Sequence, residues 1–476
     1  MSTSGLILVT GATGKIGLSI AQHLERLGGG VSLARASEVS EDQLLRRFQE
    51  DDVMTQVDAQ TSERPTRLMG TRGSQLAYAI RDFLQRSDVP FEWIELSSDD
   101  EAREKAKVSG LRDGRLPVCV LPDGTRLECP TIRQIIEKLG WFHDPSRKEY
   151  DLAILGGGPA GLSAAVYGAS EGLKTVLIER WVVGGQAGTT SRIENYLGFP
   201  DGVSGADLAQ RARDQACKFG AEILLLREGV RAEFQRGKFV GYLADGTKIV
   251  MHAGVCATGV EYRRLGLPSE EHLYGRGVYY GAGVSEASLC VNEDVYVVGG
   301  GNSAGQAALH FANFARKVFM VIRGDGLKDT VSQYLIDRIK SSAKIEVLTH
   351  TEVTELLGDS MLEAITLTNN QTAEKRTVKT TNLFLCLGGV PNTHWADEAG
   401  VICDEQRYLV TGPDLRQYEA PDKRWPLDRA PYYLETSQPG LFAAGDVRHN
   451  SVKRCASAVG EGAMAVTFVH RYLANQ

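Results

Sequence analysis

Two glycine-rich segments, at residues 156–161 and 299–304, have the composition of dinucleotide-binding loops. The first reads Gly-Gly-Gly-Pro-Ala-Gly and the second Gly-Gly-Gly-Asn-Ser-Ala, and each directly follows an apolar run and precedes a helical pattern. Glycines in such a strand-to-helix turn let the backbone approach a pyrophosphate, and the helix N-terminus attracts its charge. The pattern alone is weak evidence, but this strand-turn-helix context is the one it requires. We therefore predict two dinucleotide sites, formed by Gly156, Gly158, Pro159, Ala160 and Gly161, and by Gly299, Gly301, Asn302, Ser303 and Ala304.

The residue that ends the next strand distinguishes the two sites. At the first site this residue is Glu179, which can accept hydrogen bonds from ribose hydroxyls. At the second site the strand ends at Arg323, with Lys328 shortly after it and no acid at the strand end. A cation at this place accommodates a 2′-phosphate, so the second site favours NADPH over NADH. The alternative for Arg323 is a solvated surface cation.

Further segments resemble those that surround the flavin in thioredoxin reductases, within the pyridine nucleotide-disulfide oxidoreductase family. They are Gly-Gly-Gln-Ala at 184–187, Ile-Glu-Asn-Tyr at 193–196, Ala-Thr-Gly at 257–259, Gly-Asp at 445–446 and Arg-Cys-Ala at 454–456. The resemblance covers residues 149–476 and implies that FAD occupies the first site. Asp446 would bind the ribityl chain, and a helix starting near Ala458 would face the flavin, although Cys455 replaces the family's glutamine. The flavin residues implied in this way are Gly185, Gln186, Asn195, Ala257, Thr258, Gly259, Gly445, Asp446, Arg454, Cys455 and Ala456.

The redox dithiol of that family is missing. Where the family has Cys-Ala-Thr-Cys-Asp, this chain places Gly281 and Val284 in one register, or Ala282 and Ser285 in a register shifted by one residue. None of these is a thiol, and thiol-disulfide exchange requires a thiolate. Glu286 stands near the acid position of the motif and is the single candidate for a catalytic group, an exposed helix carboxylate being the alternative.

The leading functional hypothesis is therefore an FAD-dependent NAD(P)H oxidoreductase. Hydride would pass from NADPH to FAD and then directly to an unidentified acceptor, a small molecule or a redox protein, with rotation of the nucleotide domain as in the family. One alternative is a flavin-dependent oxidase or dehydrogenase of a small metabolite. Another is a redox-sensing or scaffold flavoprotein.

The expected fold class is α/β, with two Rossmann-like three-layer dinucleotide-binding domains. The FAD-binding domain would comprise residues 149–262 and 387–476, and the NAD(P)H-binding domain, residues 263–386, would be inserted within it. Residues 63–145 resemble a glutaredoxin, with Ser74 and Ala77 in place of its two cysteines and Pro117 at the position of its cis-proline. Residues 1–62 resemble a single β-α-β unit of a short-chain dehydrogenase.

Charge and composition exclude several classes of partner. The net charge is −7 and no basic run stands out, which argues against nucleic acid. No apolar run approaches the ~20 residues needed to cross a bilayer, so no membrane partner is expected. The eight cysteines include no C-x-x-C pair and no zinc-ligand spacing, which indicates a reduced cytoplasmic protein without a structural metal. The family resemblance implies a homodimer.

Overall fold

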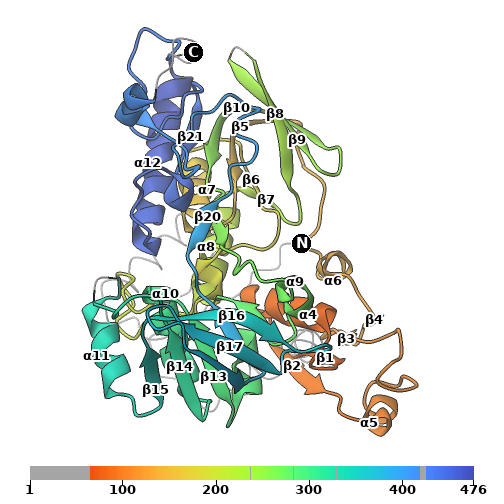
Figure 1. Ribbon diagram of the computed structural model, residues 1–476. Helices are drawn as coiled ribbons and strands as arrows, with labels where there is room; N and C mark the ends of the chain where they lie inside the picture. The colour runs from red at the N-terminus through yellow and green to blue at the C-terminus, as the bar shows by residue number, and fades with distance from the viewer. Residues whose placement is uncertain (1–64, 236, 282, 329, 419–424, 476) are drawn as a thin grey trace, which may run out of the picture. The chain divides into compact units, whose positions relative to one another are not determined.

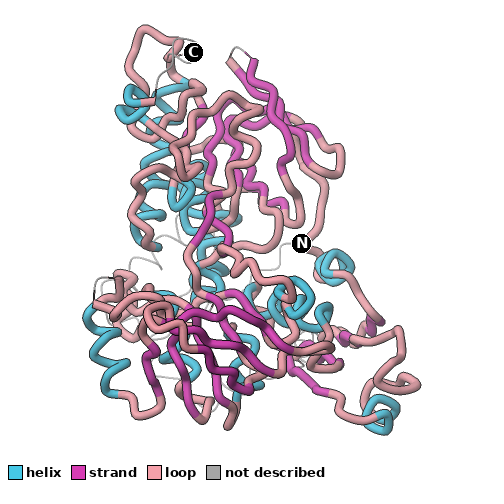
Figure 2. Tube along the Cα trace, viewed as in Figure 1, coloured by secondary structure: helices cyan, strands magenta, loops and turns pink. Residues whose placement is uncertain are grey.

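Five β-sheets organise the part of the chain that the structure, a computed structural model, describes (Figures 1 and 2). This part is residues 65–475 without 236, 282, 329 and 419–424, and it belongs to one compact unit that begins at Pro65. The β-α-β unit expected for residues 1–62 lies outside the described residues. None of the described helices is both long enough and apolar enough to cross a membrane.

The first sheet, of four strands, is formed by residues 66–128 in the order β2-β1-β3-β4. Strand β1 pairs in parallel with β2 and antiparallel with β3, and the Leu116–Pro117 peptide before β3 is cis. The elements are β1 Thr66–Gly70, α4 Gln75–Arg86, β2 Phe91–Glu95, α5 Asp99–Glu104, β3 Val118–Val120, β4 Arg126–Glu128 and α6 Ile132–Lys138.

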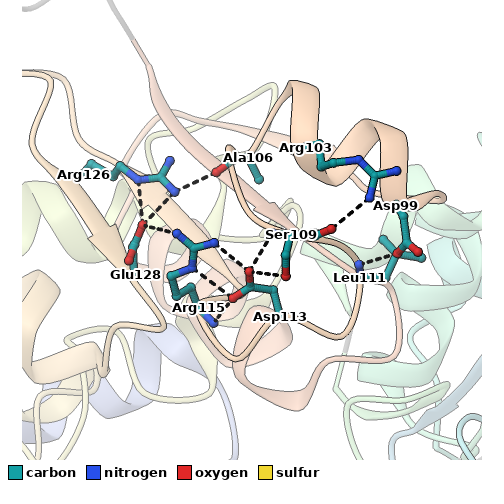
Figure 3. A network of polar contacts seen from close by, with 9 residues as sticks. All are labelled: Asp99, Arg103, Ala106, Ser109, Leu111, Asp113, Arg115, Arg126 and Glu128. Atoms are coloured by element: carbon teal, nitrogen blue, oxygen red, sulfur yellow. Dashed lines mark hydrogen bonds and ion pairs between the residues drawn. The ribbon is translucent and has the colours of Figure 1, made fainter.

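A polar network holds the long connection from α5 to β3 (Figure 3). Asp113 accepts hydrogen bonds from the Ser109 backbone N–H at 2.7 Å and from the Arg115 guanidinium at 2.7 Å, and these contacts lower its carboxyl pKa. Asp99 accepts from the Leu111 backbone N–H at 2.8 Å. These contacts fix a segment with almost no regular structure just before the cis-proline.

The largest sheet has seven strands and is built from two separate stretches of the chain. Strands β5, β6 and β7 run parallel, β10 joins β5 in parallel, and β21 from the C-terminal stretch pairs with β10. Helices α7 and α12 pack against each other in one apolar cluster beside this sheet (Figure 1). The elements are β5 Glu149–Leu155, α7 Pro159–Ser170, β6 Thr175–Ile178, η1 Ala187–Thr189, α8 Gly205–Lys218, β7 Glu222–Leu224, β8 Gly229–Gln235, β9 Lys238–Leu243, β10 Lys248–Cys256, η3 Gly412–Gln417, β21 Leu441–Ala443, η4 Gly445–Val447 and α12 Cys455–Leu473.

A parallel five-stranded sheet, in the order β12-β19-β13-β14-β15, lies between those two stretches in the sequence. The antiparallel pair β11-β20 stands where the chain leaves the seven-stranded sheet and where it returns. A three-stranded antiparallel sheet, β16-β17-β18, completes this region. The elements are β11 Val260–Tyr262, α9 Glu270–Leu273, β12 Val278–Tyr280, η2 Val284–Cys290, β13 Asp294–Val298, α10 Asn302–Phe311, β14 Lys317–Val321, α11 Gln333–Ser341, β15 Ile345–Leu348, β16 Thr351–Leu357, β17 Ala364–Asn369, β18 Lys375–Lys379, β19 Leu383–Leu385 and β20 Gly389–Pro391.

Helix α4 connects the first sheet to the five-stranded sheet and to the seven-stranded sheet. Tyr78 belongs to the apolar core of the five-stranded sheet and packs edge-on to Tyr274, with ring centroids 5.5 Å apart. The core around α4 in turn includes Val182, which follows β6. Arg81 forms an ion pair with Glu286 of η2 at 3.4 Å, and both side chains are only 1% exposed.

The Arg81–Glu286 pair carries a stability prediction, because breaking a buried pair leaves an uncompensated charge. Burial raises the pKa of Glu286 to about 7, against the opposing effect of Arg81. We expect Arg81→Met to lower the free energy of unfolding by about 3 kcal/mol, measured by urea denaturation followed by circular dichroism.

The matched control is Arg103→Met, which removes an exposed ion pair with Asp100. This variant should change stability by about 0.5 kcal/mol or less. Equal effects of the two substitutions would show that the buried pair does not hold α4 against η2.

Candidate functional site

Backbone-to-backbone contact shapes the first glycine loop, between β5 and α7. Gly156 has φ +105°, and a Cβ there would lie 2.3 Å from the Ala257 carbonyl oxygen. A Cβ at Gly161 would lie 1.8 Å from the Gly156 carbonyl oxygen. Helix α7 begins at Pro159, and no side chain caps its N-terminus. Its first N–H groups are therefore available to an anion.

Glu179 follows β6 directly and holds the same loop. Its carboxylate accepts hydrogen bonds from the backbone N–H groups of Gly157 at 2.6 Å and Trp181 at 2.7 Å. Burial raises its pKa, although these hydrogen bonds oppose that effect. A carboxylate offers about four acceptor positions, so the two backbone bonds leave capacity for ribose hydroxyls.

The C-terminal stretch supplies a second uncapped helix. Helix α12 begins at Cys455 rather than near Ala458, and no side chain caps it. Its start is one turn earlier than predicted because Arg454 has the extended conformation of an N-cap residue. Asp446 lies just before it, and burial raises the pKa of this carboxyl. The Lys453 ammonium donates to the Asp446 carbonyl oxygen at 2.7 Å.

These elements surround one cavity of about 860 Å³. Asn302 and Ser303 of the second glycine loop line it as well, together with Gln306 and Tyr334. Arg338 of α11 forms an ion pair with Glu194 at 2.7 Å, which ties the two regions together beside the cavity. Of the predicted flavin residues, those that line the cavity are Gly156, Gly158, Pro159, Ala160, Glu179, Gly185, Gln186, Asn195, Ala257, Thr258, Gly259, Gly445, Asp446, Arg454 and Cys455.

Seven predicted binding residues are not in the cavity wall. Gly161 lies within α7, where it allows the close contact with the Gly156 backbone. Ala456 lies within α12, directly after the first residue of that helix. The remaining five belong to the second site and are Gly299, Gly301, Ala304, Arg323 and Lys328. Of the residues predicted for the second site, Asn302 and Ser303 in the first turn of α10 are therefore the ones that line the cavity.

The second glycine loop repeats the geometry of the first. A Cβ at Gly299 would lie 2.4 Å from the Cys386 carbonyl oxygen, and α10 begins without a side-chain cap. The Asn302 side chain accepts from the Ser332 backbone N–H at 2.7 Å. Arg323 and Lys328 are exposed, and neither side chain forms a hydrogen bond or ion pair with any described residue. Both cations are free to meet a phosphate.

The segment in place of the family dithiol is closed to a side chain at Gly281. This residue has φ +78°, and a Cβ there would lie 2.5 Å from the Tyr262 hydroxyl oxygen. Ala282 lies outside the described residues. The Ser285 hydroxyl donates to Glu286, whose carboxylate is buried rather than exposed and does not line the cavity. The geometry therefore assigns Glu286 to the contact with α4.

Cysteines do not replace the missing pair. All eight are free. Cys256 and Cys455 line the cavity, and burial raises their thiol pKa values to about 12 and about 11. Burial also raises the pKa of Cys290, which is fully buried, to about 12. Thiols of such high pKa are protonated at neutral pH and are poor nucleophiles.

Sequence reasoning missed many residues of the cavity wall, among them Arg86 and Tyr262. The Tyr262 hydroxyl is 3.2 Å from that of Thr189, which donates to the Gln186 carbonyl oxygen at 2.8 Å. Since Thr189 has a single hydroxyl proton, Tyr262 must be the donor of this pair. No local sequence pattern indicates either residue, because each reaches the cavity only through tertiary packing.

Comparison with known proteins agrees with this geometry. Residues 150–462 match the family described as pyridine nucleotide-disulphide oxidoreductase. A thioredoxin reductase from Listeria innocua is 35% identical over 68% of this chain and 94% of its own length. The crystal structure of a thioredoxin reductase from T. acidophilum is similar with a TM-score of 0.61 and 27% identity, covering 68% of this chain and 99% of that one.

A second solved structure, the thioredoxin reductase of Lactococcus lactis, also has a TM-score of 0.61, with 28% identity over 69% of this chain and 100% of that one. The two glycine loops and their sheets correspond to the FAD and NAD(P) Rossmann-like fold of these proteins. The chain therefore belongs to the pyridine nucleotide-disulphide oxidoreductase family and is a thioredoxin reductase-like flavoprotein oxidoreductase.

Proposed function

We propose that this enzyme passes hydride from NADPH to FAD, and that the electrons then go directly to an acceptor without a protein dithiol. The observation that carries the proposal is a cavity lined by both the flavin motifs and the first turn of α10, with no thiol at Gly281 or Val284. FAD supplies the redox chemistry when it is bound, and the protein supplies position and electrostatics.

In this proposal, different elements of the cavity wall have different roles. The uncapped start of α7 would bind the pyrophosphate, and Glu179 would bind ribose hydroxyls. The uncapped start of α12 would stabilise negative charge on the reduced flavin. The Tyr262 hydroxyl, whose pKa burial raises to about 12, stays protonated and donates to the Thr189 hydroxyl.

The proposal includes a thioredoxin fold for residues 63–145. The strand order β2-β1-β3-β4 and the cis-proline before β3 support it, and Ser74 serves as the N-cap of α4 where the family has a cysteine. Such a domain would act in docking and not in redox chemistry. The homodimer and the cytoplasmic location stay predictions.

One pair of glycine substitutions tests the two nucleotide sites separately. Gly158 and Gly301 both have negative φ, and a Cβ would lie 3.9 Å from Gly185 Cα at Gly158 and in open space at Gly301. Both alanine variants should therefore fold normally. We expect Gly158→Ala to weaken FAD binding about tenfold or more, and Gly301→Ala to weaken NADP⁺ binding similarly, by isothermal titration. Each variant is the control for the other, and unchanged affinities in both would refute the assigned sites.

The cations at the second site test the preference for NADPH. Arg323→Ala/Lys328→Ala removes two exposed charges, so the NADP⁺ dissociation constant should rise about tenfold or more while that for NAD⁺ stays within about twofold. Arg316→Ala, which removes an exposed partner of Asp294, is the control and should change neither constant. Equal loss of both ligands in the double variant would mean that these residues do not recognise the 2′-phosphate.

The functional proposal is tested by rapid mixing of the anaerobic protein with NADPH. We expect fast bleaching of the flavin absorbance and no turnover with thioredoxin, because the described thiols are buried or unpaired. Absence of bleaching would favour the alternative of a metabolite oxidase or a sensor. Robust thioredoxin reduction would refute the argument about the missing dithiol.

A further inference from the structure

Helix α4, which connects β1 and β2 of the first sheet, ends at the wall of the flavin cavity. Its last residue, Arg86, lines the cavity, and its Nη2 donates to the Gly185 carbonyl oxygen at 3.1 Å. Gly185 in turn packs against the first glycine loop, since a Cβ there would lie 3.2 Å from Gly158 Cα. The guanidinium is therefore next to the turn expected to bind the pyrophosphate.

The Arg86 charge is incompletely satisfied by the protein. The side chain is 18% exposed, and its Nε is buried without a hydrogen-bond partner among the described residues. Its nearest carboxylate is that of Asp82, one turn earlier in α4, at 3.5 Å. Its charge also acts on Glu179, where it opposes the effect of burial on the carboxyl pKa. A buried donor left unpaired is unfavourable, so an anion that accepts from Arg86 would be bound favourably.

We infer that Arg86 binds the diphosphate of the flavin dinucleotide, so that residues 65–142 complete the FAD site of the enzyme. This inference rests on the flavin site of the proposed function and adds a binding residue from outside the FAD-binding segments. It also gives these residues a role in which no thiol is needed. By linkage, FAD and the docked position of α4 stabilise each other by the same amount.

The test compares substitutions of two arginines in this region. Arg72 is the matched control, because its Nη2 donates to Leu289 O at 3.0 Å and Asn382 Oδ1 at 3.2 Å, and its Nε likewise has no partner. Arg72 docks the same region but does not line the cavity. FAD affinity is measured by fluorescence titration of flavin-depleted full-length protein at several salt concentrations.

We expect Arg86→Met to weaken FAD binding about tenfold or more and to reduce its dependence on salt, because one charge that attracts the diphosphate is lost. Arg86→Lys should recover most of the affinity. Arg72→Met should stay within about threefold of the unmodified protein. The inference is overturned if Arg86→Met binds FAD normally, or if Arg72→Met loses as much affinity as Arg86→Met does.

Hydrogen exchange provides a readout independent of affinity. FAD should slow amide exchange in residues 75–86 of the unmodified protein, and this protection should be reduced in Arg86→Met at saturating FAD. No change in exchange on adding FAD would contradict the linkage. Failure of the unmodified protein to bind FAD at all would instead refute the flavin site itself.

Discussion

The cavity depends on the contact of backbone with backbone around the first glycine loop. Gly156 meets Ala257, Gly161 meets Gly156, and Gly185 meets Gly158, each at a distance that leaves little or no room for a side chain. Because these segments touch, the N-terminus of α7 opens directly into the cavity, and Glu179 can bind the loop from the adjacent strand. The same contacts bring Gly185 within reach of Arg86. Main-chain contacts thus shape this part of the site, and the Glu179 side chain holds the first glycine loop in place.

The features predicted well from the sequence are those with a local cause. Each glycine loop stands between a strand and a helix adjacent in the chain, so the pattern at 156–161 and at 299–304 identifies its own surroundings. The return of the chain to the seven-stranded sheet was also predictable, because β21 precedes the Gly-Asp pair at 445–446. Helix starts were less well predicted. Helix α12 begins at Cys455, about one turn before the expected start near Ala458, and Cys455 itself lines the cavity.

The features that the sequence could not predict arise from tertiary contacts. Glu286 had two interpretations, as a group near the flavin or as an exposed carboxylate, but it is buried against Arg81, about two hundred residues earlier in the chain. Arg86 has no motif around it, and only the docking of α4 brings it to the cavity. The space beside Gly281 is closed by Tyr262. The sequence predicted that no thiol is present at this position, but it did not predict that the Tyr262 hydroxyl occupies the space.

The division of the seven-stranded sheet into two stretches has a consequence for biosynthesis. Strand β21, Asp446 and the start of α12 are made only after the whole five-stranded region has been translated. The wall around the cavity therefore remains open while the ribosome produces residues 263–386, and pairing of β21 with β10 closes it at the end. Cofactor capture is then coupled to completion of the polypeptide, so that an interrupted translation product would not hold its flavin.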